Sequence, residues 1–130
     1  MGRIEHGLLV YLGVGREDDD RDLEYTVEKI THLRVFPDEA GKMNRSVVEA
    51  GGGVLVISQF TLYGDTRGAR RPSYGAAAAP QIARPFYERS LELFRARGLT
   101  TAAGVFGAMM EVSAVNCGPV TIMIDSKKAF

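Results

Sequence analysis

The chain has 130 residues, enough for one domain with a substantial core, in which we expect about two-thirds of the unfolded surface to become buried. Its 16 Lys and Arg residues balance 16 Asp and Glu residues, which excludes a protein that holds nucleic acid by bulk positive charge, so any such contact needs a local patch. One cysteine excludes an internal disulfide, two histidines offer no zinc cluster, and no run suits a signal peptide or membrane span, so we expect a cytoplasmic protein without metal, cofactor or membrane contact.

The first third of the chain predicts a strand, a helix and a hairpin. Residues 8–14 are apolar at nearly every position, as in a strand covered on both faces. Carboxylates at residues 17–20 suit a helix start, and Leu23, Val27, Ile30 and Leu33 follow at helical spacing. Residues 35–36 begin a short strand, and the turn residues 37–41 predict a hairpin into residues 42–48.

The centre of the chain predicts one strong strand that becomes polar at its end. Three glycines at residues 51–53 invite a phosphate-loop interpretation, which we reject because an apolar strand, not a helix, follows at once. We expect this strand at residues 54–63, and its second half carries Ser58, Gln59 and Thr61. Unpaired polar groups in a core cost about 1–3 kcal/mol each, so these groups either bond to neighbouring backbone or face a ligand.

A basic loop and a second helix lead to the last predicted strands. Residues 64–75 hold the densest positive charge, Arg67, Arg70 and Arg71, which suits either solvated surface or phosphate oxygens. Pro80 suits the first position of a helix that ends near Gly98. Strands are then expected at residues 100–106, 109–115 and 120–125, which makes residues 1–130 a single α/β domain with helices against sheet.

A Gly-Pro pair, Gly118 and Pro119, separates the last two apolar runs. Proline has no N–H for a strand ladder and glycine adds no side chain to packing. The pair suits either a tight corner or backbone carbonyls presented to a ligand that approaches closely. We expect the neighbouring Cys117 to be a small buried apolar residue rather than a nucleophile.

The remaining residues point to a neutral site rather than an acid–base site. His6 and His32 are far in sequence from Ser58 and Thr61, so no Ser-His-Asp set is assembled. The candidate carboxylates lie in or beside turns, where acidic residues are common. Hydroxyls, an amide and backbone N–H groups at a strand end can stabilise an oxyanion. This chemistry suits hydrolysis of an activated ester whose own hydroxyl assists.

Two segments together resemble the signature motifs of the D-aminoacyl-tRNA deacylases (D-tyrosyl-tRNA deacylases). The first consists of Ser58, Gln59, Phe60, Thr61 and Leu62, and the second of Asn116, Cys117, Gly118, Pro119, Val120 and Thr121. Residues 41–44, 65–67 and 71–73 resemble the same family in the same order, so the resemblance covers about residues 7–125. Either motif alone is a weak signal, whereas both at this separation are a strong one.

The resemblance implies a homodimer that removes D-amino acids from the 3′ end of tRNA, with mostly antiparallel sheet layers and two helices on one side. It also implies a cis peptide bond between Gly118 and Pro119, and a motif that enters the active site of the other subunit. Selectivity would then come from exclusion of L side chains by this pair, together with Asn116, Val120 and Thr121 as substrate-binding residues.

By the same resemblance, Ser58, Gln59, Phe60 and Thr61 line the ester pocket, with backbone N–H groups at the oxyanion. We expect the ribose 2′-hydroxyl of the tRNA to assist, rather than Thr61 to act as nucleophile, because no base is placed to activate it. Arg67, Arg70 and Arg71 are the candidates for contact with acceptor-stem phosphates.

Two further interpretations stay open. Family members usually begin with a β-hairpin ahead of the segment equivalent to residues 8–14, and it is largely absent here, with Arg3 the one arginine available to replace its loop-fixing arginine. One alternative is a non-catalytic tRNA-end binding or dimerisation module of the same fold. The other is an editing deacylase for glycine or small L-amino acids.

Overall fold

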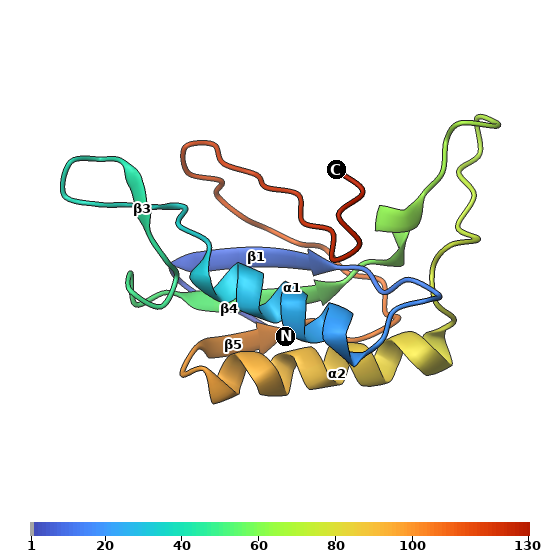
Figure 1. Cartoon of the computed structure of the whole chain (residues 1–130), viewed down its shortest axis with the longest axis horizontal. Helices are drawn as coiled ribbons and strands as arrows, with labels where there is room; N and C mark the ends of the chain where they lie inside the picture. Colours follow the sequence, from blue (N-terminus) through green and yellow to red (C-terminus); the bar gives the residue numbers. More distant parts are fainter. Residues whose placement is uncertain (1) are drawn as a thin grey trace.

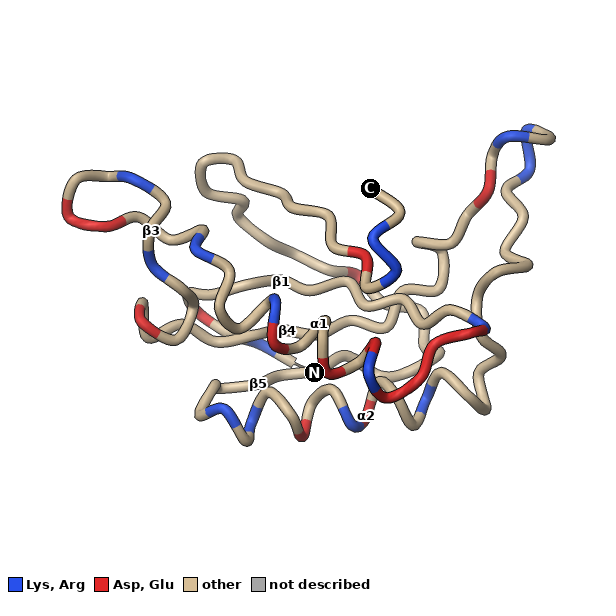
Figure 2. Tube along the Cα trace, viewed as in Figure 1, with Lys and Arg blue, Asp and Glu red and all other residues tan. Residues whose placement is uncertain are grey.

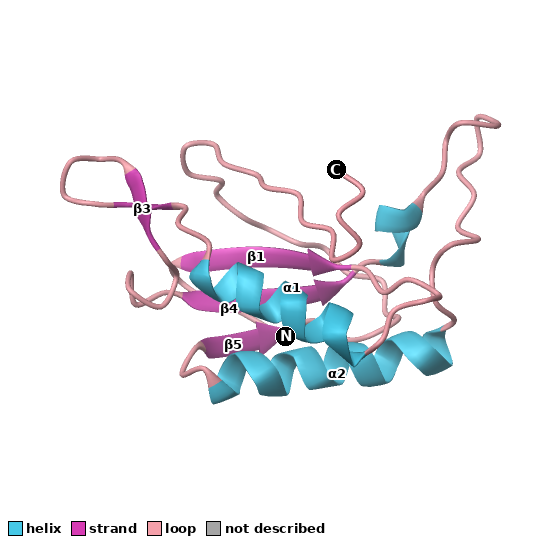
Figure 3. Ribbon diagram, viewed as in Figure 1, coloured by secondary structure: helices cyan, strands magenta, loops and turns pink. Residues whose placement is uncertain are grey.

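The computed structural model describes residues 2–130, in which two helices and a small sheet form layers (Figure 1, Figure 3). In chain order the elements are β1 (Gly7–Leu12), α1 (Asp20–His32), β2 (Phe36–Pro37), β3 (Met43–Arg45), β4 (Gly53–Ser58), the 3₁₀ helix η1 (Phe60–Tyr63), α2 (Pro80–Ala96) and β5 (Thr100–Ala103). Within these residues no helix combines the length and the apolar character that crossing a membrane requires.

The main sheet is parallel, so the expectation of mostly antiparallel layers is wrong. Its order is β1-β4-β5, with Gly7 opposite Gly53 and Gly53 opposite Thr100. Parallel neighbours need a crossover connection, which α1 supplies between β1 and β4 and α2 between β4 and β5. The antiparallel pairing between named strands is the predicted hairpin, β2 with β3.

Local chemistry explains where both helices begin. Asp19 caps α1: its carboxylate accepts from the N–H of Arg21 at 3.0 Å, and the Asp22 carboxylate in turn accepts from the Asp19 N–H at 2.9 Å. Pro80 opens α2, where its missing N–H costs nothing, and the predicted stop at Gly98 has φ +80°. Both predicted helices are therefore confirmed.

Both helices cover the same face of the sheet. The fully buried Val54 and Val56 of β4 share one apolar cluster with Val27 of α1 and Phe94 of α2. Full burial of such side chains contributes about 1.5–3 kcal/mol each. The Tyr87 hydroxyl of α2 also donates to the Val56 carbonyl oxygen at 2.9 Å, which fixes α2 against β4. The α/β class and the placement of two helices on one side are thus confirmed.

Several predicted strands are shorter than expected or are not strands. β4 ends at Ser58, and residues 60–63 turn into η1, because β1 already ends at Leu12 and the Gln59 N–H makes the last bond to it, to the Leu12 carbonyl at 2.8 Å. Residues 109–115 and 120–125 form no strand, because no strand of residues 2–130 lies alongside to complete a ladder.

We call residues 104–124 the C-terminal excursion. Figure 1 shows it as a long loop that leaves the end of β5, runs back along the sheet and returns. Many of its apolar side chains face solvent: Met109 is fully exposed, and Val115 and Met123 are 90% and 72% exposed. Glu111 is its one charged residue, so Figure 2 draws the loop almost entirely in tan. Such a surface is typical of a region that binds another molecule.

Candidate active site

The first motif lies where β4 ends and η1 begins; we call Ser58, Gln59, Phe60 and Thr61 the strand-end segment. Gly13, just after β1, allows η1 to pack closely there. A Cβ atom at Gly13 would lie 3.2 Å from the Gln59 carbonyl oxygen and 3.3 Å from the Tyr63 ring. The segment is thus held by rigid neighbours, while its side chains are half-buried or exposed.

Neutral groups make up the polar part of this segment. The Gln59 side-chain amide donates to the Thr61 hydroxyl. No titratable side chain of residues 2–130 hydrogen-bonds to Thr61, so nothing there activates it as a nucleophile. The backbone N–H groups of Phe60 and Thr61, at the start of η1, make no hydrogen bond within the described chain, and Gln59 gives no side-chain cap. These N–H groups can therefore receive an oxyanion.

Two aromatic side chains lie beside the N–H groups of Phe60 and Thr61. The Phe60 ring meets the Tyr74 ring edge-on, with centroids 5.1 Å apart, and Phe60 is still 57% exposed. Tyr74 comes from the end of the basic loop and was missed in the sequence, where nothing but its aromatic character marks it. The pair offers an apolar surface to a ligand near the η1 N–H groups.

The second motif forms a small closed loop at residues 116–121. The Asn116 side chain spans it: its amide nitrogen donates to the Thr121 hydroxyl at 3.1 Å, and its oxygen accepts from the Val120 N–H at 3.1 Å. The Gly118–Pro119 peptide bond is cis, as the resemblance implies, and Gly118 has φ +122°. Glycine suits this conformation because it has no Cβ atom.

Cys117 is exposed, so the expectation of a buried cysteine is wrong. The reason is that the loop projects from the fold instead of turning between two core strands. Neighbouring Val115 is also 90% exposed, which shows that the apolar character of this run does not reflect burial within one chain.

One chain does not bring the two motifs together. In Figure 1 the far end of the C-terminal excursion lies over the start of β1, whereas η1 lies beyond the opposite end of that strand. None of the hydrogen bonds among residues 2–130 joins the strand-end segment to residues 116–121. A site that uses both motifs therefore needs a second source for one of them.

The basic loop is closed at its base and charged at its tip. The backbones of Asp65 and Ser73 exchange two hydrogen bonds, of 2.7 and 2.9 Å. Arg67 forks onto the Asp65 carboxylate at 2.7 and 2.9 Å and holds the pKa of that carboxyl well below its usual range. Arg70 and Arg71 make no ion pair in the described part of the chain, and Figure 2 shows the positive charge at the loop's outer end. Arg70 and Arg71 are therefore more available to bind phosphate than Arg67, which is already paired with Asp65.

A charged cluster that sequence reasoning missed lies between η1 and the C-terminus. It contains Asp18, Asp22, Tyr63 and Lys127, with the Lys127 ammonium 2.9 Å from Asp22. Burial, and next the Asp18 carboxylate, raise the pKa of Tyr63 to about 12, so its hydroxyl stays protonated. Residues this far apart in sequence give no local signal.

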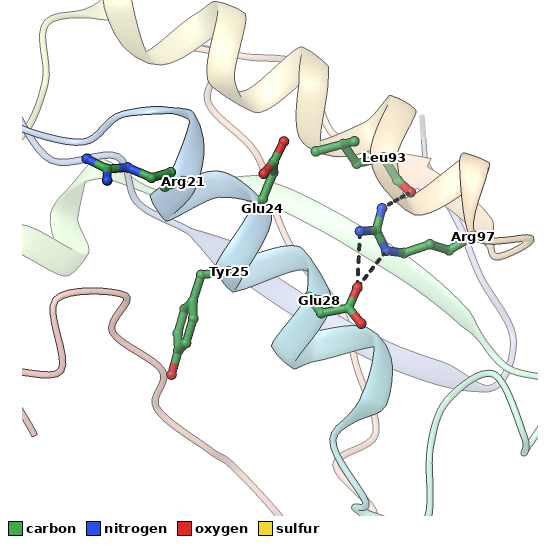
Figure 4. A pocket seen from close by; sticks show the side chains of 6 residues that line it. All are labelled: Arg21, Glu24, Tyr25, Glu28, Leu93 and Arg97. Atoms are coloured by element: carbon green, nitrogen blue, oxygen red, sulfur yellow. Dashed lines mark hydrogen bonds and ion pairs between the residues drawn. The ribbon is translucent and has the colours of Figure 1, made fainter.

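The groove between α1 and α2 has a structural role. It is lined by Arg21, Glu24, Tyr25, Glu28, Leu93 and Arg97 (Figure 4). The Arg97 guanidinium donates to Glu28 at 3.1 Å and to the Leu93 carbonyl at 3.0 Å, so it links the helices. Within residues 2–130, no three His, Cys, Asp or Glu side chains group as metal ligands.

Comparison with known proteins assigns the family. A family model for D-Tyr-tRNA(Tyr) deacylase matches residues 1–125. The chain is 57% identical to a D-aminoacyl-tRNA deacylase of Koribacter versatilis, covering 99% of this chain and 87% of the relative, and 56% identical to one of Symbiobacterium thermophilum, covering 100% and 86%. It also resembles the solved structure of a c-Myc DNA Unwinding Element Binding Protein, with a TM-score of 0.85, 40% identity, and coverage of 92% of this chain and 81% of that one. The chain therefore belongs to the D-Tyr-tRNA(Tyr) deacylase family.

Proposed function

We propose that this protein hydrolyses the ester bond of D-aminoacyl-tRNA and so removes D-amino acids from tRNA in the cytoplasm. The observation that carries the proposal is full-length similarity, at 57% identity over 129 residues, to a relative named D-aminoacyl-tRNA deacylase. The structure supports it, because the residues of both motif segments are half-buried or exposed and none is buried in the core.

The strand-end segment receives the ester. The substrate carbonyl lies against the start of η1, where the Phe60 and Thr61 N–H groups stabilise the oxyanion as it forms. The Gln59 amide holds the Thr61 hydroxyl, which shapes the pocket with Ser58. Since no side-chain base is in contact, the tRNA's own 2′-hydroxyl assists the reaction.

The Gly118–Pro119 loop is the chirality filter. Its tip carries no bulky side chain, and the Asn116 clamp to Val120 and Thr121 fixes its shape. A filter of this kind rejects an L side chain by steric exclusion rather than by attracting the D isomer. Glycine, which has no side chain to exclude, passes such a filter.

A homodimer completes the site. The two motifs lie at opposite ends of β1 in one chain, so the excursion of a second copy supplies the filter. The excursion fits this role because it is exposed, apolar and almost uncharged, and because the backbone polar groups of an extended segment readily pair with another chain.

Complementation between two variants that each lose most of their activity tests the dimer. Phe60→Ala damages the strand-end segment and Gly118→Ala damages the filter. If each site takes one motif from each copy, mixing the two after dissociation and reassociation restores about a quarter of wild-type activity, since half the dimers are mixed and each has one intact site. No recovery in a mixture that sedimentation shows to be dimeric would refute the shared site.

The basic loop binds the tRNA. Arg70 and Arg71 contact acceptor-stem phosphates, and Arg67 contributes less because Asp65 already engages it. The phosphate contacts position the 3′ end and leave recognition of the amino acid to the two motifs.

The activity test uses tRNA charged with D-Tyr, L-Tyr, Gly or L-Ala. Release of D-Tyr and Gly with retention of L-Tyr supports the proposal. Release of L-Ala with retention of D-Tyr assigns an editing deacylase instead. Thr61→Ala should keep most of the turnover, and complete loss with intact binding would make Thr61 the nucleophile.

A second candidate is a non-catalytic nucleic-acid binding module. It is favoured by the similarity to the c-Myc DNA Unwinding Element Binding Protein, whose name describes binding to a DNA element. In the same assay this module binds charged tRNA, and each of the four esters decays at its spontaneous rate. A matched duplex DNA probe then shows whether binding extends beyond tRNA.

A further inference from the structure

The C-terminal residues fold back onto α1 and hold the end of the excursion. Asp125 organises a tight turn: its carboxylate accepts from the N–H groups of Lys127 at 2.9 Å and Ala129 at 3.2 Å. The turn directs the Lys127 ammonium to Asp22 at 2.9 Å and to Asp18 at 4.0 Å. We call Lys127, Asp22 and Asp18 the tail clasp.

The tail clasp is more shielded than an ordinary surface ion pair. The Asp22 and Asp18 side chains are 12% and 14% exposed, whereas Lys127 is half exposed. Burial raises the pKa of Asp22, but hydrogen bonds from Lys127 and the Asp19 backbone outweigh it and lower the pKa to about 2. Asp22 is thus charged across the physiological range and holds the lysine.

A second contact supports the same turn. The Lys128 ammonium lies 5.7 Å from the Tyr25 ring centroid, and Lys29 lies 5.6 Å from the same centroid. Lys127 and Lys128 therefore reach neighbouring positions on α1. Both lie outside residues 1–125, the part that the family model matches.

The excursion has few other attachments. Near its start, Phe106 packs on Tyr87, with ring centroids 5.8 Å apart. Near its end, Ile124 packs against the core cluster. Between residues 111 and 123, the hydrogen bonds found in the described chain are internal to the loop. The position of residues 116–121 therefore depends on how firmly the two ends are held.

We propose that Lys127 is a positioning residue: through Asp22 and Asp18 it fixes the end of the C-terminal excursion and thereby sets where the Gly118–Pro119 filter stands. This inference rests on the proposed function of that pair. A filter that works by exclusion depends on its position, because small misplacements near a reacting group are costly.

The test compares Lys127→Gln with Lys127→Arg and with Arg95→Gln, which removes the same charge from an exposed position of α2 that makes no ion pair in residues 2–130. We expect Lys127→Gln to lower kcat for D-Tyr-tRNA about tenfold. KM should change less than about twofold, because the basic loop that holds the tRNA is intact. Lys127→Arg should keep kcat near the wild-type value, because a guanidinium can reach both the Asp22 and the Asp18 carboxylates.

Hydrogen exchange separates positioning from folding. In Lys127→Gln, amides of residues 111–123 should exchange faster by a larger factor than amides of β4, whereas Arg95→Gln should change neither set. Unchanged kcat or unchanged exchange would overturn the inference. So would a general loss of stability without rescue by arginine, which would assign an ordinary structural role. If wild-type protein releases no amino acid, the proposed function fails, and the exchange measurement still decides whether the clasp anchors the excursion.

Discussion

Replacing Gly118 by alanine tests the filter most directly. The backbone there has φ +122°, and an added Cβ atom would lie 2.8 Å from the Cγ2 atom of Val120. Gly107, in the same excursion, offers a matched control: its φ is +76°, and a Cβ atom there meets nothing within 4 Å. Both changes add positive-φ strain, and Gly118→Ala alone adds a clash.

Near the φ of Gly107, in the left-handed region, this strain costs about 1–2 kcal/mol; the φ of Gly118 lies beyond that region, so the strain there is larger unless the loop shifts. The clash must be relieved by moving Val120, whose β-branched side chain has little rotamer freedom, or by moving the loop. Since the loop is held by the Asn116 clamp rather than by the core, it shifts instead of unfolding the domain. A loss of about 1.4 kcal/mol of transition-state stabilisation is about tenfold in rate, so we expect at least that loss for D-Tyr-tRNA.

The assay is single-turnover release of D-Tyr and L-Tyr from tRNA by both variants. We expect Gly118→Ala to lose at least about tenfold of the D-Tyr rate, and Gly107→Ala to stay within about threefold of wild type. Melting temperatures should match within about 2 °C. Equal rates for the two variants would show that the geometry of Gly118 is irrelevant to the reaction.

Further substitutions have expected outcomes. Tyr87→Phe removes the bond to the Val56 carbonyl and should lower the free energy of unfolding by about 1 kcal/mol in urea titration, whereas no change would mean that the bond adds nothing. The pKa of Asp22 falls from 3.8 to about 2 on folding, so the stability that its carboxylate adds is present above pH 3.8 and is lost as the pH falls toward 2. In Asp22→Asn the free energy of unfolding should therefore vary less with pH between 3.8 and about 2. Burial raises the pKa of Asp18, so folding favours its neutral form; the stability that this adds is present below pH 3.8 and is lost as the pH rises through the raised pKa. Asp18→Asn can still accept from the Gly15 N–H, so it should leave the free energy of unfolding at pH 7 unchanged or higher. Replacing Arg70 and Arg71 by alanine should reduce the slope of log K against log salt by about 1.4–1.8, and Arg67→Ala by less, because Asp65 engages Arg67.

Local patterns predicted the elements whose causes are local. The carboxylates ahead of α1 include the Asp19 cap, and the spacing of Leu23, Val27 and Ile30 matches the buried face. Pro80 and Gly98 bracket α2 for equally local reasons. These elements depend on neighbours within a few residues, which a sequence displays directly.

Features that depend on distant partners were not predictable in the same way. Residues 109–115 have the composition of a strand, yet a strand exists only where another lies alongside, and β5 ends at Ala103. The parallel sheet depends on two crossovers, and the tail clasp joins Lys127 to an aspartate 105 residues away. The motif residues were found because their spacing resembles a family, while Tyr74 and Tyr63 beside them carried no comparable signal.

The two halves of the proposed site differ in how firmly they are held, and this difference constrains how selectivity could arise. The strand-end segment follows β4 directly and packs on Gly13, so its N–H groups are fixed by the sheet. The Gly118–Pro119 loop has internal bonds and projects into solvent. Steric exclusion discriminates only if moving the filter costs more than accepting the wrong isomer. An isolated excursion moves at little cost. Under the proposed function, discrimination would therefore depend on where the loop is attached: at the tail clasp and, in the proposed dimer, at the surface of the second copy.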